Sequence, residues 1–256
     1  MKLAVMQPYF LPYIGYFQGI YAVDKYILYP NLTFIKDGWM NRNRILVKNG
    51  PVSIISVPLV NKSSNFMINE IRIDHTQPWS QKMLKTFFLN YKGSAHFDEF
   101  YPFLSELLNQ RFEFLSELNA HLIVAISKYI GIKTEIEYNN FDKYIDLEEQ
   151  LLSVDHGDYS LFKFMEKTRP VKKVARVLEL ARRENASDFI NAIGGQSLYS
   201  KEEFAHYAVN LNFIQTADFS YPQFKSDFNP HLSIVDVLMH NGKDNTLELI
   251  KKYNLV

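Results

Sequence analysis

The N-terminal segment alternates strand, helix and strand within about thirty residues, and this order restricts the fold more than any other feature. Lys2–Met6 is a short apolar run that ends before Pro8, and Lys25–Tyr29 is a second such run that ends at Pro30. Tyr13–Val23 lies between them and can form a helix. Such βαβ units are almost always right-handed, with parallel strands. The segment therefore predicts an α/β fold built on a parallel sheet.

The alternation continues to the end of the chain. Further strands are predicted at Val52–Pro58, Ile68–Ile73, Thr134–Tyr138, Asp188–Ile193 and Asn212–Ala217. Helices are predicted around Val174–Ala181 and at Glu202–Ala208, Ser233–Met239 and Asp244–Tyr253. Apolar residues also recur at helical spacing from Met83 to Ile126, and Gly131 is a suitable stop. Since no linker or repeat interrupts the chain, we predict a single α/β domain over residues 1–256. It has a mostly parallel Rossmann-like sheet, flanking helices and a helical insertion around 80–130.

Charge and cysteine content exclude several classes of protein. The 28 Lys and Arg balance the 28 Asp and Glu, so a surface that binds nucleic acid or anionic lipid is not expected. With no cysteine, disulfides, Cys-ligated metals and thiol nucleophiles are excluded. Neither a signal peptide nor an apolar stretch of about 20 residues is present. We therefore expect a cytoplasmic protein with no membrane span and no nucleic-acid partner.

The segment Gln7–Phe17 follows the first strand and opens the first helix. Ligands of open α/β sheets bind outside the carboxyl ends of strands, so Gln7, Tyr9, Tyr13 and Tyr16 are candidate site residues. A helix N-terminus also favours an anion. The alternative is a rigid turn whose tyrosine rings fill space. Nucleotidyltransferases place a His-x-Gly-His tetrad where Tyr13 to Tyr16 stand here, but neutral phenols lack its cationic charge, so this is an analogy of position only.

A second candidate segment, Lys36–Ile45, combines hydrogen-bond donors with an aromatic ring. Asn41, Arg42 and Asn43 offer donors suited to phosphate, carboxylate or sugar hydroxyls, and Trp39 offers a flat face for a sugar or base. The alternative is a solvated basic turn with the indole anchored in the core. Two asparagines flanking an arginine beside tryptophan favour the binding hypothesis.

Three weaker signals follow later in the chain. Gly194 and Gly195 come after a predicted strand and can expose backbone N–H groups to an anion, although a tight connection explains them equally well. Asp236 and His240 lie four residues apart on a helix, as a general base and its orienting carboxylate would, but a surface pair has the same spacing. Arg176 belongs to a basic run typical of a solvated face, yet its apolar neighbours indicate that it points inward.

No histidine spacing indicates a metal site, and no P-loop, G-x-G-x-x-G or G-x-S-x-G motif is present. Neither a metal nor a resident cofactor is therefore expected.

Taken together, the ordered segments resemble the WbqC-like protein family. The resemblance rests on four blocks that span nearly the whole chain: Gln7–Phe17, Trp39–Ile45, Ile193–Gly195 with Tyr199, and Leu232–Met239. Members of this family resemble products of bacterial surface-polysaccharide gene clusters, especially those for O-antigen, a part of lipopolysaccharide, and for unusual amino sugars.

The resemblance implies a cytoplasmic transferase that adds an acyl or aminoacyl group to the amine of a nucleotide-linked amino sugar. The implied partners are that nucleotide-linked sugar and an acyl or peptidyl carrier protein whose thioester is the donor. Arg42, with the asparagines on either side, would hold phosphate or hydroxyls, Gln7 would lie beside the reacting centre, and Asp236 or His240 would be the base. Two alternatives stay open. One is a nucleotidyltransferase-like enzyme with a degenerate phosphate-binding tetrad, and the other is a non-catalytic sugar-nucleotide-binding or assembly protein.

Overall fold

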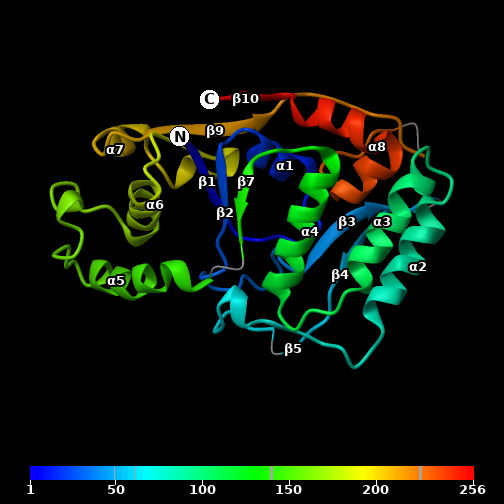
Figure 1. Ribbon diagram of the computed structural model, residues 1–256, viewed down its shortest axis with the longest axis horizontal. Helices are drawn as coiled ribbons and strands as arrows, with labels where there is room; N and C mark the ends of the chain where they lie inside the picture. The colour runs from blue at the N-terminus through cyan, green and yellow to red at the C-terminus, as the bar shows by residue number, and fades with distance from the viewer. Residues whose placement is uncertain (49, 61, 139–140, 225–226) are drawn as a thin grey trace.

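The computed structural model describes residues 1–48, 50–60, 62–138, 141–224 and 227–256. Within them, a six-stranded sheet runs through the middle of the molecule in the order β10-β9-β8-β1-β2-β7 (Figure 1). Its strands are β1 (Lys2–Met6), β2 (Lys25–Leu28), β7 (Glu135–Glu137), β8 (Asp188–Ala192), β9 (Asn210–Thr216) and β10 (Tyr253–Leu255). All pair in parallel except β10, which runs antiparallel to β9. The predicted mostly parallel, Rossmann-like sheet with flanking helices is confirmed.

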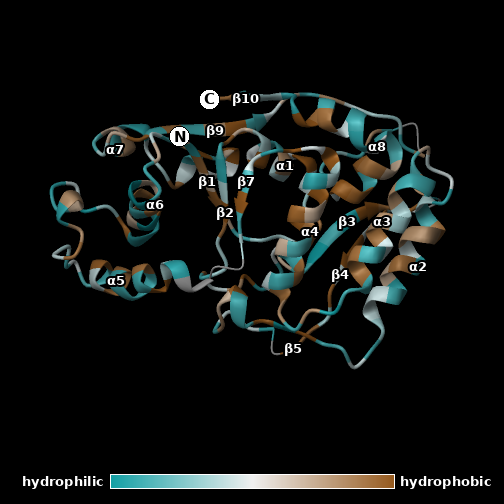
Figure 2. Ribbon diagram, viewed as in Figure 1, coloured by the Kyte–Doolittle hydropathy of each residue, from teal (hydrophilic) through white to brown (hydrophobic). Residues whose placement is uncertain are grey.

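The two faces of the sheet are buried under different helices (Figure 1). Because successive strand residues point to opposite faces, Leu3 and Ile27 belong to one apolar core, and Ala4 and Tyr26 belong to the other. On the face of Ala4 lie α1 (Ile14–Tyr21), α4 (Leu115–Ile130) and α8 (Ile234–Ile250), and the same core extends outward to α3 (Phe97–Asn109), which packs on α8, and to α2 (Trp79–Tyr91), which packs on α3 (Figure 1). The face of Leu3 is covered by α5 (Ile145–Asp155), α6 (Lys172–Arg183) and α7 (Lys201–Ala205). Apolar and polar residues alternate along these helices, as a helix with one buried face requires (Figure 2).

The helical insertion is confirmed as α2, α3 and α4. Leu104, Leu108 and Leu118 are fully buried at the spacing that predicted it. Gly131 ends α4 with a φ of 93°, a left-handed conformation that glycine adopts without strain.

A hairpin stands outside the central sheet. The strand predicted at Val52–Pro58 forms as β4 (Val52–Ser56), and it pairs antiparallel with β3 (Arg42–Leu46), which the sequence did not predict. The strand predicted at Ile68–Ile73 is wrong for its first half, which forms the short 3-10 helix η1 (Ile68–Glu70) because the Glu70 carboxylate accepts the Met67 N–H at 2.7 Å. Only β6 (Arg72–Ile73) is extended, paired with β5 (Leu59–Val60).

The C-terminal region departs from the prediction at three places. The two predicted helices join as α8 across Gly242, whose φ of 67° breaks the regular helix. Tyr253, expected at the end of a helix, begins β10 instead. Gly194 and Gly195 lead into a 3-10 helix, η4 (Ile193–Ser197), before α7. In the middle of the chain, the sequence did not predict α5, nor the two 3-10 helices on either side of it, η2 (Phe141–Tyr144) and η3 (Lys163–Met165).

The strand order identifies where a ligand would bind. After β1 the chain moves outward to β2 and β7, and then crosses back to β8 on the other side of β1. The carboxyl ends of β1 and β8 therefore flank the topological switch point of the sheet, the crevice at which open α/β sheets bind ligands.

Candidate functional site

Three adjoining hollows among the described residues lie at this switch point, and we call them together the switch-point cleft. The first, the Arg44 pocket, has a volume of about 350 Å³ and is lined by Tyr9, Tyr13, Trp39, Asn43, Arg44 and His231, among others. The second, the apolar hollow, measures about 360 Å³ and shares Tyr13, Thr216 and His231 with the first. The third, of about 100 Å³, lies against the strand ends and the rings of Tyr9, Tyr13, Tyr16 and Tyr26. Tyr13 thus stands where all three hollows meet.

The loop after β1 is held in one shape by side chains from distant segments. The Asn43 amide donates to the carbonyl oxygens of Phe10 and Leu11 at 3.0 and 2.8 Å, and the Asn119 amide donates to that of Pro8 at 2.9 Å. The Ser233 hydroxyl also donates to the Leu11 oxygen, at 2.8 Å. These bonds hold Leu11 at a φ of 42°, a left-handed conformation that costs a branched residue free energy. The cleft is therefore bounded by a pre-formed loop.

Gly15 makes room for the Tyr13 ring and also lines the third hollow. A Cβ at this position would lie 2.3 Å from the Tyr13 ring, so glycine is required for the ring to fold back over the start of α1. Burial raises the pKa of Tyr13 and of Tyr16, which keeps both phenols neutral. The Tyr16 hydroxyl donates to the Gln7 carbonyl oxygen at 2.8 Å, and the Tyr9 hydroxyl to the Gln7 amide oxygen at 3.4 Å. The predicted tyrosines therefore meet at the cleft as uncharged groups.

Side chains along β3 point alternately to its two faces, so the arginines of this segment lie on one face and Asn43 on the other. The guanidinium groups of Arg42 and Arg44 lie 5.8 and 5.5 Å from the centre of the Trp39 ring. Arg44 lines the cleft, whereas Arg42 donates to the carbonyl oxygen of Asp37 and faces its carboxylate at 3.7 Å. Asn43 points back to the Phe10 loop and touches the cleft only at its edge.

Asn41 is buried and has a structural partner. Its amide nitrogen donates to the Val57 carbonyl oxygen at 2.9 Å and so joins the start of β3 to the end of β4. It lines none of the three hollows.

Arg44 is the residue that the sequence analysis missed in this segment. Its Nη2 donates to the His231 carbonyl oxygen at 3.0 Å, and no carboxylate among the described residues lies within 4.0 Å of its guanidinium. A strand pattern over Arg42–Leu46 would have placed both arginines on one face. His231, also missed, follows Pro230 in an irregular loop, where no periodicity marks it.

The predicted Asp236 is fully buried and His240 is half-buried, and neither lines any of the three hollows. The Asp236 carboxylate accepts hydrogen bonds from the hydroxyls of Tyr91 and Tyr221 at 2.8 and 2.7 Å and from the Gln223 amide at 3.0 Å. The closest approach of the His240 ring nitrogen to it is 3.9 Å. Burial raises the pKa of Asp236, and the hydrogen bonds from these donors offset only part of that rise. Burial lowers the pKa of His240. The structure thus does not bring this pair to the cleft, although Asp236 fixes Tyr221, which lines the apolar hollow.

The remaining predicted residues also lie outside the hollows. Gly194 is exposed, and Gly195 is buried, with the Asn191 amide only 2.6 Å from where its Cβ would stand; the neighbouring Ile193 does line the Arg44 pocket. Arg176 points inward on α6, as its apolar neighbours indicated. There it forms two hydrogen bonds, of 2.6 and 2.7 Å, to the carboxylate of Glu148, which also accepts the Tyr29 hydroxyl at 2.7 Å.

A second polar region lies on the other face of the sheet, the face of Leu3, at the start of β2. We call it the ion-pair cluster; it consists of Lys25, Glu137, Lys143, Tyr144 and Glu184. Lys25 lies 2.7 Å from both Glu137 and Glu184, and Lys143 lies 2.9 and 2.6 Å from the same two carboxylates.

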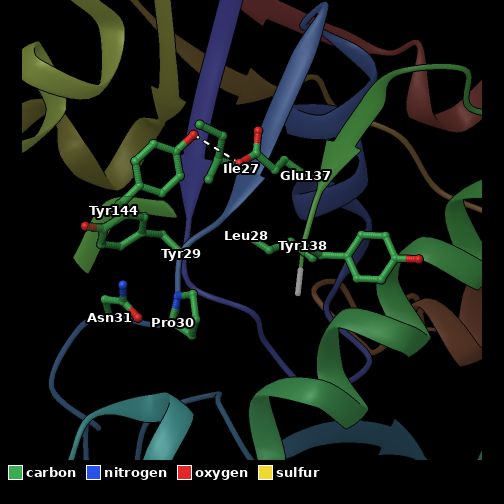
Figure 3. Close-up of a pocket in the computed structure, with 8 residues that line it drawn as sticks. All are labelled: Ile27, Leu28, Tyr29, Pro30, Asn31, Glu137, Tyr138 and Tyr144. Carbon is green, nitrogen blue, oxygen red and sulfur yellow. Dashed lines mark hydrogen bonds between the residues drawn. The ribbon is translucent and has the colours of Figure 1, made fainter. Parts of the chain in front are cut away.

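The hollow beside the ion-pair cluster cannot hold a substrate. In Figure 3 the Tyr144 hydroxyl bonds to Glu137, while Tyr138 points away from the other side chains. The space between them is about 10 Å³, which is room for about one water molecule. Charged side chains here form structure, not a binding site.

Two kinds of function receive no support from the described residues. No three His, Asp or Glu side chains gather there as a metal ion would require. Among the helices of the same residues, none combines the length and the apolar character needed to cross a membrane.

Comparison with known proteins gives one family and one distant relative. A model of the WbqC-like protein family matches residues 7–248, which include the loop after β1, β3, η4 and most of α8. The uncharacterized protein Rv1507c of Mycobacterium tuberculosis (strain ATCC 25618 / H37Rv) is 27% identical over 246 residues, covering 95% of each chain. Among solved structures, none gives a significant match.

Proposed function

The chain belongs to the WbqC-like protein family, and from this premise we propose that its switch-point cleft binds a nucleotide-linked amino sugar and transfers an acyl or aminoacyl group to the sugar amine. The family resemblance extends the proposal to a cytoplasmic enzyme of O-antigen or other surface-polysaccharide biosynthesis, with a carrier-protein thioester as donor.

The observation that carries the binding step is the guanidinium of Arg44 beside the exposed face of Trp39. Arginine binds phosphate oxygens through paired N–H groups, and an indole face stacks on a sugar or base. Because Arg44 has no carboxylate partner among the described residues, its charge is available to a diphosphate. The Arg44 pocket, at about 350 Å³, is within the range of small-molecule sites.

The transfer step forms a C–N bond between the sugar amine and the donor's thioester carbonyl, and it breaks the C–S bond. The amine loses a proton, and the leaving thiolate gains one. Such a reaction needs the amine and the thioester carbonyl held close together and a group that accepts the proton. The pre-formed loop and the neutral phenols of Tyr9, Tyr13 and Tyr16 support this assignment of the cleft.

One alternative is nucleotidyl transfer. The position of Tyr13 and Gly15 at the start of α1 favours it, but the lack of positive charge on the tyrosines opposes it. Tyr13 and Gly15 open α1 directly after β1, where such enzymes bind phosphates. However, a phenol carries no positive charge in either protonation state, and burial raises the pKa of Tyr13 and Tyr16 so that both stay neutral; neither can replace the cationic imidazoles at a triphosphate. Release of pyrophosphate from a nucleoside triphosphate and Mg²⁺ would favour this alternative over ours.

Calorimetry with UDP- and dTDP-linked amino sugars tests the binding step. Arg44→Gln should weaken binding about 30-fold, since a charge-assisted bond to phosphate is worth about 2 kcal/mol. Arg42→Gln should weaken it less, because Arg42 faces Asp37. Arg72→Gln is the matched control, since Arg72 lies on a strand with its guanidinium 5.6 Å from the Phe114 ring, and it should bind as the unaltered protein does.

Two results would contradict the proposal. Binding of neither nucleotide sugar would remove the substrate class, and equal affinities for Arg44→Gln and Arg72→Gln would remove the Arg44 pocket as its site. Binding without amide product across a broad panel of thioesters would instead support the non-catalytic alternative.

A further inference from the structure

The switch-point cleft has two large compartments of different chemistry. The Arg44 pocket contains the cation and the indole, whereas the apolar hollow is lined mainly by Phe219, Tyr221, Phe228 and other apolar groups. Their volumes, about 350 and 360 Å³, are nearly equal. The proposed function assigns the nucleotide sugar to the first compartment, and the second, beyond Tyr13 and His231, has a different lining that suits a different group.

His231 lies at the boundary between the compartments. It lines both, together with Tyr13 and Thr216, and its ring meets the Tyr13 ring edge to face at 6.0 Å. No other histidine among the described residues lines either compartment. An imidazole at this place can reach a group bound on either side.

The backbone of His231 is held in an uncommon conformation. Its φ of 58° is in the left-handed region, and its carbonyl oxygen accepts the 3.0 Å hydrogen bond from Arg44. Backbone strain of this kind is concentrated at functional sites. Leu11, in the loop after β1, also has a positive φ, and its carbonyl oxygen accepts a hydrogen bond from Asn43. Two neighbouring residues of β3 thus bind the backbone of the two loops that contribute Tyr13 and His231 to the junction.

The apolar hollow contains one carboxylate, Asp218, on the segment that follows β9. No basic side chain among the described residues lies within 4.0 Å of it. An acyl chain would bind to apolar walls alone, whereas an aminoacyl group carries an ammonium that needs an anion. Among the described residues that line this mainly apolar compartment, Asp218 is the one carboxylate, and it favours the aminoacyl group.

We propose that the apolar hollow binds the aminoacyl group of a thioester donor, with its ammonium at Asp218, and that His231 removes the proton from the sugar amine that attacks across the junction. This inference rests on the proposed function of the Arg44 pocket. The sugar nitrogen forms a bond to the thioester carbon, and His231 accepts the proton that the nitrogen loses. Collapse of the tetrahedral adduct breaks the C–S bond, and the departing thiolate receives the proton from His231.

The test measures amide formation by mass spectrometry from a UDP-linked amino sugar and S-glycyl-N-acetylcysteamine, or its S-acetyl counterpart. His231→Asn should lower kcat at least about 100-fold, as loss of a general base does, with KM for the sugar nearly unchanged. Asparagine tolerates the left-handed conformation, and the backbone oxygen that Arg44 binds remains. His206→Asn, at the exposed end of α7, is the control and should keep full activity.

The donor preference tests the role of Asp218. Asp218→Asn should lower kcat/KM for the glycyl donor about fivefold and leave the acetyl donor unaffected, since an exposed ion pair contributes up to about 1 kcal/mol. Asp98→Asn, in the exposed first turn of α3, should affect neither. Thermal unfolding of each variant shows that it is folded.

Several outcomes would overturn the inference. They are an unaltered kcat in His231→Asn, an equal effect of Asp218→Asn on both donors, and no amide from either donor by a protein that binds the nucleotide sugar. In the last case sugar binding at the Arg44 pocket would stand. If calorimetry shows no sugar binding, the proposed function itself fails.

Discussion

The switch-point cleft and the ion-pair cluster contain similar residues but differ in what is left unpaired. Both combine tyrosines with charged side chains beside strands of the parallel sheet. In the cluster, each carboxylate of Glu137 and Glu184 meets two lysines within 2.9 Å, and the adjoining space is about 10 Å³. In the cleft, the Arg44 guanidinium meets a backbone oxygen and an indole but, among the described residues, no carboxylate, and it lies beside about 350 Å³ of space. The types of residue present therefore do not distinguish a binding site from a structural cluster. The difference is that, in the part of the chain that the structure describes, the cleft has a charged side chain without an ion-pair partner next to space that a ligand could fill.

The largest effect should come from Asn43→Ala, which removes a residue at the edge of the cleft. The Asn43 side chain donates to two loop carbonyls and accepts from the Arg44 N–H at 2.8 Å, and all are buried or half-buried. Leaving them without partners should lower the free energy of unfolding by about 3 kcal/mol in urea titrations. Nucleotide-sugar binding should fall as well, because the loop after β1 loosens.

The control for this prediction is Asn210→Ala, which removes an exposed asparagine of β9. It should change the free energy of unfolding by less than about 0.5 kcal/mol. An Asn43→Ala protein as stable as this control would show that the loop after β1 does not depend on the hydrogen bonds of the Asn43 side chain.

The sequence predicts the sheet well because the central strands are short apolar runs. It misses β10, whose residues Tyr253–Leu255 are short and largely exposed at the sheet edge. It also misses α5, although Leu147, Leu151 and Val154 recur at helical spacing and are buried. That signal was present in the sequence; the one for β10 was not.

The site is predicted only in part. The loop after β1 and the segment at Trp39 do meet in the cleft, since Tyr9, Tyr13 and Trp39 all line the Arg44 pocket. The roles of the polar residues could not be derived, because Asn is depleted in strands and the segment, with Gly38 and two asparagines, resembles a turn. Once β3 exists, alternation turns Asn43 toward the loop and Arg44 toward the cleft. The partners of a buried polar group, such as Asp236, lie far away in sequence and leave no local signal.

Glu184→Gln should act on stability alone. The Glu184 side chain is 10% exposed, and burial disfavours its charge. Hydrogen bonds from Lys143, Lys25 and Tyr144 outweigh burial and lower its pKa to about 2. Losing the charge should cost about 2 kcal/mol of unfolding free energy after allowance for solvent screening. Nucleotide-sugar affinity should be unchanged; a tenfold loss would show that the two regions are coupled.

The same carboxylate predicts a pH dependence of stability. Because its pKa falls from 4.5 in the unfolded chain to about 2 in the folded protein, the stabilisation is complete above pH 4.5 and disappears as pH falls toward 2. The stability difference between the unaltered protein and Glu184→Gln should therefore shrink over this range. Urea unfolding at pH 7, 4 and 3 measures it, and a difference that stays constant would mean that the ion-pair cluster does not depend on this charge.

The smallest effect, about 1 kcal/mol, should follow from Trp39→Leu, and it should appear in binding rather than in folding. Trp39 as a residue is 42% exposed, so the loss of its ring removes little buried area. It does remove the face against which Arg42 and Arg44 lie, and an exposed cation–π contact contributes about 0.5–1 kcal/mol. Calorimetry should show affinity for the nucleotide sugar about fivefold lower. Phe114→Leu removes the equivalent contact with Arg72 outside the cleft and should leave affinity unchanged. If both variants bind equally well, the indole orients the arginines without touching the ligand, and the unpaired charge of Arg44 alone distinguishes the cleft from the ion-pair cluster.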